Sequence, residues 1–433
     1  MARTDDPDHR YLQARNRLRD ASIPDRDKEA SLEFLDALNP DTSTINFYSD
    51  DGVRETKSYG TLAAYAQALK RVAELAEQPL CEFENARAVN ALFDDLGSGE
   101  HPDVKEGGYG KSTMAQWESA VSKFFEHHDS LGVDHEAIVI DRQEKSTVDE
   151  RDMYTPDQVQ QLREAVTNTR DRCILELLLN TGQRIRAVQT LRVKDVNTDA
   201  GVYYLNTADG GLKGADKNGK KRPLLGAKRA VYDWLKDHPT GEPDDYLITC
   251  LPTAARGTPG DKLSQSNIRD RLRGIADDAG VDKPPNPHNF RHYFVTACKR
   301  DYEMDESTIK HLIGHGQGSR IMETTYQHLS DNDHVEAAEV AAGLREPDAG
   351  SPLTPKICPT CSESLAPEAK ACPGCGTVFA PDAQATQAQI EEDVKADYRE
   401  TDPSDEETME RLETLDELLD DPEVKEALFE RVD

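Results

Sequence analysis

The sequence predicts a mainly α-helical protein with a small antiparallel β-sheet and a separate cysteine-rich module towards its C-terminus. Three observations support this fold class. Apolar residues recur at helical spacing along most of the first 345 residues. One pair of strand-like segments flanks a turn rich in Gly and Lys. Four cysteines form two Cys-x2-Cys pairs. A chain of 433 residues has room for two or three domains.

The first part of the chain is expected to be a helical bundle. Residues 1 to 28 are rich in charge and are expected to form an N-terminal arm. Helices follow in which apolar residues share one face, and we find no strand signal before residue 130. The expected helices cover residues 27–39, 58–77, 83–97 and 110–129, the second with Ser58 as a possible N-cap.

The second part begins after a polar connector at residues 141–154. Thr155, Pro156 and Gln158 have the spacing of a helix start, with a capping residue, a first-position proline and a glutamine at the third position. The almost wholly apolar stretch 172–182 ends at a glycine and is expected to be a buried central helix. Residues 202–207 and 220–226 are the expected strands. The chain then reads as helical to about residue 345.

These patterns predict six successive segments, the second and fourth of which are folded domains. They are an arm at 1–28, a helical domain at 29–140, a linker at 141–154, a mixed but mostly helical domain at 155–345, a cysteine module at 355–380 and an acidic tail at 381–433.

The formal net charge is −31, with 83 acidic against 52 basic residues. Taken alone, this argues against binding to DNA, because phosphates repel anions. The tail from residue 381 holds 20 Asp and Glu against 5 Lys and Arg, so it carries −15 of that total. The remaining acid is dispersed over the folded part, which indicates a solvated surface in very salty cytoplasm and hence a halophilic source. Residues 210–229 are the exception, with seven Lys and Arg and the single acid Asp216.

The chain is expected to be soluble and cytoplasmic. No apolar run approaches the roughly 18 residues that cross a bilayer, so no membrane partner is expected. The first residues lack the apolar region of a signal peptide. Cys81, Cys173, Cys250 and Cys298 lie in helical or apolar settings and are expected to be buried thiols.

Five residues between positions 184 and 326 can assemble into one site for chemistry on an anion. Arg184 follows the glycine that ends the central helix, and His288 and Arg291 are three apart on one helix face. His315 lies in a Gly-His-Gly turn, and Tyr326 follows eleven residues later in Thr-Thr-Tyr-Gln-His. Each alone has an ordinary explanation as a core, turn or helix-capping residue. Their flanking motifs and their order along the chain favour a common site.

This order and the motifs "NTGQR", "HNFRH", "LIGH" and "TTYQH" resemble the tyrosine recombinase family of phage integrases and chromosome-dimer resolvases. The resemblance covers residues from about 30 to 340 and is strong only in the motifs. It implies a core-binding helical (SAM-like) domain that clamps DNA, followed by a catalytic domain. It also implies that Tyr326 is the nucleophile, that Arg184 and Arg291 bind the phosphate, that His288 is a general acid/base and that His315 is a second phosphate-binding histidine.

The family also has a lysine in a β-hairpin turn that protonates the leaving 5′-oxygen. Two candidates remain open. Lys217 matches the usual spacing to the following arginine, with a slight preference, and Lys213 has the usual lysine-glycine setting, while a solvated turn is the ordinary explanation for either. One position departs from the family. Ala187 stands where most members carry an acidic residue that orients the first arginine, which puts in doubt how Arg184 is supported.

The chemistry of the set is consistent with this resemblance. Attack on a phosphodiester builds charge on non-bridging oxygens, and guanidinium groups supply donors that do not deprotonate. A tyrosine phenol has a pKa of about 10 and needs such activation before it attacks phosphorus. The resulting 3′-phosphotyrosine keeps the bond energy, so rejoining needs no ATP, and the arginines remove the need for a catalytic metal.

The four paired cysteines predict a structural zinc ribbon. Two Cys-x2-Cys pairs ten residues apart suit a tetrahedral site with Zn–S distances of about 2.3 Å. Disulfides are the alternative, which a cytoplasmic setting disfavours. Four protein ligands leave no open position, so the zinc would serve structure or recognition of DNA or a protein. The ligands would be Cys358, Cys361, Cys372 and Cys375.

The acidic tail has two interpretations. Met409, Leu412, Leu415 and Leu419 have near-helical spacing, which suits an amphipathic helix that docks on a neighbouring copy or masks a basic DNA surface. The alternative is a partly disordered, solubilising tail.

The sequence as a whole favours a site-specific DNA recombinase or integrase whose partners are double-stranded DNA and, by the resemblance, three further copies of the chain on paired sites. A monomer or dimer is possible without DNA. One alternative is a non-catalytic DNA-binding or plasmid-maintenance factor on the same fold. Another is a zinc-ribbon transcription adaptor, although the ribbon is a small part of the chain.

Overall fold

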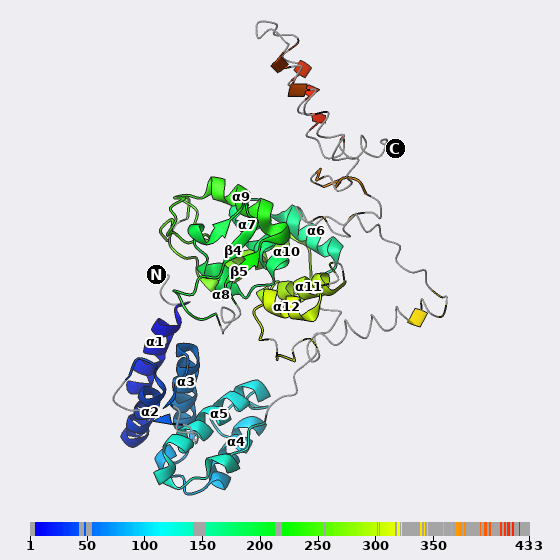
Figure 1. Cartoon of the computed structure of the whole chain (residues 1–433). Helices are drawn as coiled ribbons and strands as arrows, with labels where there is room; N and C mark the ends of the chain where they lie inside the picture. Colours follow the sequence, from blue (N-terminus) through cyan, green and yellow to red (C-terminus); the bar gives the residue numbers. More distant parts are fainter. Residues whose placement is uncertain are drawn as a thin grey trace. The chain divides into compact units, whose positions relative to one another are not determined.

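The computed structural model (Figure 1) is described over most of the first 320 residues. The described ranges are 5–42, 47–48, 54–141, 153–212, 219–254, 257–300, 302, 304–316, 318–320 and 322, with scattered positions after them. The chain divides into two compact units, one of residues 1–146 with 209–211 and the other of residues 147–208 with 212–433. No helix in the described ranges combines the length and apolar character that a membrane span needs.

The first unit is a helical bundle with one short antiparallel strand pair. Its elements are α1 (Pro7–Arg19), α2 (Asp25–Leu38), β1 (Phe47–Tyr48), β2 (Arg54–Glu55), α3 (Tyr59–Leu75), the 3-10 turn η2 (Leu80–Glu82), α4 (Ala86–Ser98), α5 (Lys111–His127), η3 (Asp129–Leu131) and η4 (His135–Ala137). The aromatic rings of Phe34, Phe124 and Phe125 are fully buried in its core. The expected cap is confirmed, because the Ser58 hydroxyl accepts a hydrogen bond from the Thr61 amide.

Two features of this unit differ from the sequence-based prediction. The expected N-terminal arm at residues 1–28 contains helix α1, which places Tyr11, Ala14 and Leu18 in the core. This helix was missed because its buried face is narrow and the rest of it is charged. The expectation of no strand before residue 130 is wrong, since Phe47 pairs with Glu55 across β1 and β2. An Asp-Gly dipeptide between those segments was the available hairpin signal.

The second unit combines helices with a three-stranded antiparallel sheet of order β3-β4-β5. Its elements are α6 (Pro156–Ala165), α7 (Thr169–Thr181), α8 (Ile185–Thr190), η6 (Val193–Asp195), β3 (Val196–Asn197), β4 (Val202–Tyr204), β5 (Lys221–Pro223), η7 (Leu225–Ala227), α9 (Lys228–Asp237), α10 (Gln265–Ala279), α11 (Pro287–Arg300) and α12 (Glu306–Leu312). The mainly helical class with a small antiparallel sheet is therefore confirmed, as are the two expected strands. The two-residue strand β3 is too short to carry a period-2 signal.

Helix α7 is the centre of the second unit, as its apolar sequence predicted. It lies among α9, α10 and α11 (Figure 1), and eleven of its thirteen residues are buried. The helix before it, α6, begins with the expected capping box between Thr155 and Gln158. Buried Arg163 of α6 makes two hydrogen bonds of 2.9 and 3.1 Å to the carboxylate of Glu176 in α7. This ion pair ties α6 to the central helix.

The four scattered cysteines are buried, as expected for thiols in helical or apolar settings. Cys173 lies in α7 and Cys298 in α11, both fully buried. Cys81 and Cys250 are 6% exposed. Burial raises the pKa of the Cys81 thiol to about 12, so this side chain is un-ionised at neutral pH.

Candidate functional site

The turn between α7 and α8 positions Arg184. Gly182 ends α7 in the left-handed conformation, with φ of 57°, and Arg184 is the N-cap of α8. The Arg184 carbonyl accepts the Ala187 amide at 2.8 Å, which opens α8. Ala187 is 4% exposed and packs in the core. Its methyl side chain offers no carboxylate to orient the guanidinium of Arg184.

Helix α11 packs directly on this turn and carries Arg291. A Cβ on Gly182 would lie 2.3 Å from Cδ1 of Phe294, so only glycine permits this approach of α11. Arg291 is 3% exposed, and its Nη1 donates to the Gly182 carbonyl at 2.8 Å. The two candidate phosphate-binding arginines, Arg184 and Arg291, are therefore fixed to the same short turn.

A Schellman motif at the end of α12 positions His315. Gly314 adopts a φ of 69° and its amide donates to the His311 carbonyl at 3.1 Å. The His315 amide donates to the Lys310 carbonyl at 2.8 Å. These are the two hydrogen bonds that define the motif, with glycine in the left-handed position. The "LIGH" sequence thus fixes the backbone from which the imidazole of His315 projects.

Arg184 and His315 are in contact across the site. Nη2 of Arg184 lies 3.2 Å from Nε2 of His315. Since a guanidinium only donates, Nε2 of His315 accepts here, and its proton lies on Nδ1, 3.4 Å from the Ser319 hydroxyl. Burial, with Arg291, Arg184 and His288 as neighbouring groups, lowers the pKa of His315 to about 4. His315 is therefore neutral at physiological pH in the free protein.

The fourth predicted residue, His288, is exposed at the start of α11. Its ring lies 4.3 Å from that of buried His292, at an interplanar angle of 72°. The side-chain oxygen of Asn286 accepts the amides of His288 and Asn289, both at 3.0 Å, so it caps the helix. The contact with His292 restrains the His288 ring.

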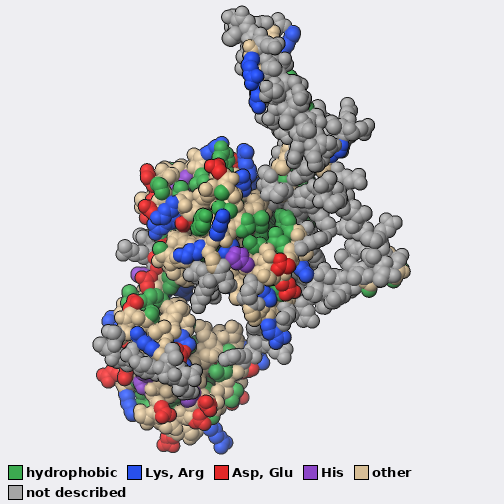
Figure 2. Space-filling view, in the orientation of Figure 1, with side chains coloured by type: hydrophobic (Ala, Val, Ile, Leu, Met, Phe, Trp, Pro, Cys, Tyr) green, Lys and Arg blue, Asp and Glu red, His purple; other side chains and the backbone are tan. Residues whose placement is uncertain are grey.

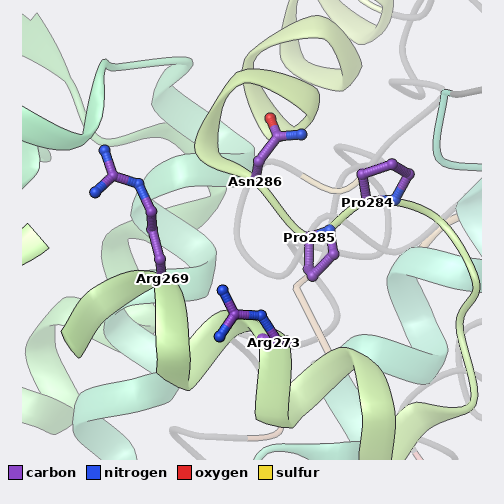
Figure 3. A pocket seen from close by; sticks show the side chains of 5 residues that line it. All are labelled: Arg269, Arg273, Pro284, Pro285 and Asn286. Atoms are coloured by element: carbon purple, nitrogen blue, oxygen red, sulfur yellow. The ribbon is translucent and has the colours of Figure 1, made fainter. Parts of the chain in front are cut away.

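A small pocket of about 110 Å³ opens beside the start of α11 (Figure 3). Arg269 and Arg273 reach it from α10, and the loop before α11 supplies Pro284, Pro285 and Asn286. On the face drawn in Figure 2, Lys and Arg side chains gather beside histidine side chains in the second unit. This local positive charge contrasts with the net charge of −31 of the whole chain.

The base of the β4–β5 hairpin contacts the same part of the structure. Arg222 of β5 is 1% exposed and its Nη1 lies 3.2 Å from Nε2 of His311, four residues before His315. Gly219, where the described part of the hairpin resumes, is close to the His311 ring, 3.9 Å from the position of a Cβ. Lys213 and Lys217 lie outside the described residues.

The structure thus brings together four of the seven predicted catalytic residues, namely Arg184, His288, Arg291 and His315. Tyr326 lies outside the described residues, as do both lysine candidates. The sequence did not reveal Gln183, Arg222 or His311 as neighbours of the site. Gln183 lies in the "TGQR" motif and Arg222 in "KKR". A motif, however, does not show which buried side chain connects two elements of the fold.

The cysteine module is described only in part. Cys358 and Cys372, the first cysteine of each pair, are both fully buried and share one small apolar cluster with Leu365. The Gly376 amide donates to the Cys372 carbonyl at 2.8 Å, and Gly376 has a φ of 70°. Cys361 and Cys375 lie outside the described residues. Within the described part of the chain, no group of three or more His, Cys, Asp or Glu could hold a metal ion.

Comparison with known families finds a match for part of the second unit. Residues 152–333 match the phage integrase family, a stretch that contains the Arg184 turn, α11 and the His315 turn. This segment is therefore similar to the phage integrase, or tyrosine recombinase, family.

Curated relatives that the chain matches are named tyrosine recombinases. The chain is 27% identical over 190 residues to tyrosine recombinase XerD of Pseudomonas putida, covering 42% of this chain and 53% of the relative. It is 29% identical over 186 residues to tyrosine recombinase XerC of Haemophilus influenzae, covering 40% of this chain and 57% of the relative. The chain thus spans about half the length of the curated relatives it matches.

Solved structures to which the chain is similar include XerA recombinase, with 19% identity, a TM-score of 0.37 and coverage of 67% of this chain and 94% of that one. XerH bound to palindromic difH substrate has 16% identity, a TM-score of 0.45 and coverage of 78% and 98%. A λ integrase dimer bound to a COC′ core site has 15% identity, a TM-score of 0.45 and coverage of 61% and 87%.

Proposed function

We propose that the chain is a site-specific DNA recombinase that cleaves and rejoins DNA through Tyr326. The observation that carries this proposal is the contact between Arg184 and His315, with Arg291 fixed to the same turn. Two guanidinium groups and an imidazole at one position suit a phosphodiester better than a neutral substrate. The match of residues 152–333 to the phage integrase family supports the same chemistry.

In this proposal the phenol oxygen of Tyr326 attacks the scissile phosphorus and the bond to the 5′-oxygen breaks. The phenol proton passes to a base, for which His288 is the candidate, and the departing 5′-oxygen takes a proton from Lys217 or Lys213. Arg184 and Arg291 donate to the non-bridging oxygens, where charge builds. A 5′-hydroxyl of a second strand then displaces the tyrosine, so the number of phosphoester bonds is conserved without ATP.

His315 has a specific part in these reaction steps. In the free protein its Nε2 accepts from Arg184, so it donates nothing at that atom. An arriving phosphate adds negative charge beside the imidazole, which favours its protonated form and offsets the two arginines. His315 can then donate to a phosphate oxygen, and Arg184 becomes available for the same phosphate.

We further propose that the partner is double-stranded DNA and that four copies act on paired sites, with a monomer or dimer in the absence of DNA. A solved λ integrase is a tetramer bound to a Holliday junction, and another is a dimer on a core site. The exposed Arg269 and Arg273 beside α11 and the basic residues at 219–229 supply charge for phosphate contacts. In this scheme the first unit is the core-binding domain that clamps the DNA.

For the cysteine module we propose one structural Zn²⁺ held by Cys358, Cys361, Cys372 and Cys375. The shared burial of Cys358 and Cys372 supports convergence of the two pairs, and thiolates at this spacing suit tetrahedral zinc. Native mass spectrometry of the full chain should find one zinc, lost in Cys358→Ser with Cys372→Ser. A double variant that retains the metal would exclude this site.

The decisive experiment uses a suicide substrate nicked near the crossover. Wild type should form a covalent protein–DNA band that resists denaturation, and Tyr326→Phe should form none. Arg291→Gln should bind the DNA and give a much weaker band. Binding by wild type without any covalent band would favour the alternative, a non-catalytic DNA-binding or plasmid-maintenance factor on this fold.

Two properties of the surface complete the proposal. The acidic tail from residue 381 docks on a copy or masks a basic surface. If it masks a basic surface, its deletion should raise the affinity for DNA. Unchanged affinity would remove the masking role.

The dispersed acid suits a halophilic source, for which the melting temperature should rise clearly in molar KCl. Equal melting temperatures in dilute buffer and in KCl would exclude that adaptation.

A further inference from the structure

The carbonyl of Leu312, the last residue of α12, receives two side-chain donors. Carbonyls in the last turn of a helix have no partner within the helix. The Schellman motif occupies those of Lys310 and His311. The Leu312 carbonyl accepts Nε2 of Gln183 at 2.7 Å and Nε of Arg222 at 3.3 Å. We call these two donors and their acceptor the carbonyl clamp. It lies three residues before His315.

Gln183 joins two helix ends. The same Nε2 lies 3.3 Å from the Thr181 carbonyl in the last turn of α7, so the amide bridges the C-termini of α7 and α12. Gln183 is 2% exposed and directly precedes Arg184 in the chain. A shift of the α12 turn away from Arg184 would therefore break a buried hydrogen bond and leave a buried amide unsatisfied.

Arg222 joins α12 to the sheet. Its Nη1 lies 3.0 Å from the Gly219 carbonyl, 2.9 Å from the Lys221 carbonyl and 3.2 Å from Nε2 of His311. The side chain thus contacts its own strand and the last turn of α12 at once. Burial lowers the pKa of Arg222 from its usual range, yet a guanidinium remains charged at any physiological pH. The hydrogen bonds that Arg222 donates therefore do not change with pH in the physiological range.

We propose that Gln183 and Arg222 are positioning residues that lock the His315 turn to the Arg184 turn and to β5, so that the imidazole and guanidinium meet one phosphate. This inference rests on the proposed recombinase function and adds residues that touch neither DNA nor the reacting atoms. The clamp acts through His315. Its loss should therefore have no further effect once the imidazole is gone.

A double-mutant cycle on covalent adduct formation tests this. Gln183→Met should lower the rate at saturating DNA about tenfold, the size expected for one buried hydrogen bond. In the His315→Ala background the same change should lower the rate no further. Gln189→Met is the matched control, because Gln189 is also buried and donates to a backbone carbonyl, that of Leu263 at 2.8 Å. The Gln189→Met protein should be less stable than wild type but should form the covalent adduct at the wild-type rate.

An equal loss from Gln183→Met in both backgrounds would overturn the proposal, as would no loss in either. A second measurement does not depend on activity. An NMR titration of the His315 imidazole should show its pKa rising from about 4 towards the ordinary value of about 6.5 in Gln183→Met and in Arg222→Met. An unchanged pKa in both would overturn the clamp. Absence of any adduct in wild type would instead overturn the recombinase function.

Discussion

Nη2 of Arg184 lies 3.2 Å from Nε2 of His315, although 131 residues separate them in the chain. The contact makes His315 an acceptor, with a pKa of about 4, in the free protein. It also supplies Arg184 with a partner at a site where Ala187 offers no carboxylate. The imidazole is thus a hydrogen-bond partner of the guanidinium in the free protein.

This pKa has a measurable consequence for stability. The folded pKa of about 4 lies below the ordinary histidine value of about 6.5, so the unfolded chain binds this proton more tightly. His315 therefore lowers the free energy of unfolding as the pH falls from about 6.5 to about 4. His315→Asn should flatten the pH dependence in that window, measured by urea unfolding of both proteins. Equal slopes would contradict the assigned burial of the imidazole.

The packing of α11 on the Arg184 turn makes Gly182 critical. Gly182→Ala introduces a Cβ in a left-handed position and against the Phe294 ring, which should cost about 3 kcal/mol. It should also weaken the covalent DNA band, because Arg291 moves with α11. Gly280→Ala is the control, since Gly280 ends α10 with a φ of 67° and nothing lies within 4 Å of its Cβ position. That change should cost only about 1 kcal/mol, and equal losses would exclude the steric explanation.

The choice between Lys217 and Lys213 can be made with a substrate whose bridging 5′-oxygen is sulfur. A thiolate leaves without a proton more readily, because a thiol pKa is about 8.5. Substitution of the general acid by alanine should slow cleavage of normal DNA strongly and cleavage of the sulfur substrate little. Substitution of the other lysine should affect both substrates alike. Were neither variant rescued by sulfur, the hairpin would not supply the acid.

The buried ion pair between Arg163 and Glu176 should contribute more to stability than an exposed pair does. Arg163→Met leaves the 3% exposed carboxylate of Glu176 with fewer donors and should cost about 3 kcal/mol in unfolding experiments. The comparison is Arg273→Met, whose partner Asp270 is exposed on α10, and which should change stability by about 0.5 kcal/mol or less. A similar cost for both would mean that burial does not strengthen the first pair.

The sequence by itself determined the mainly helical class with its small antiparallel sheet, and it predicted the candidate reactive groups. Local patterns fixed the capping box at Thr155, the central helix α7 and the strands β4 and β5, because hydrophobic periodicity and cap chemistry act over a few residues. The same local signals missed α1 and the two-residue strands, where the apolar face is narrow or the segment is too short to show a period.

Only the tertiary structure decided how those groups meet. The contact of Arg184 with His315, the approach of Phe294 to Gly182 and the donors on the Leu312 carbonyl join residues from separate elements. Such contacts depend on how helices pack, and a one-dimensional pattern contains the residue types but not the distances between them. The neutral state of His315 follows from that packing, because burial and two nearby arginines set its pKa.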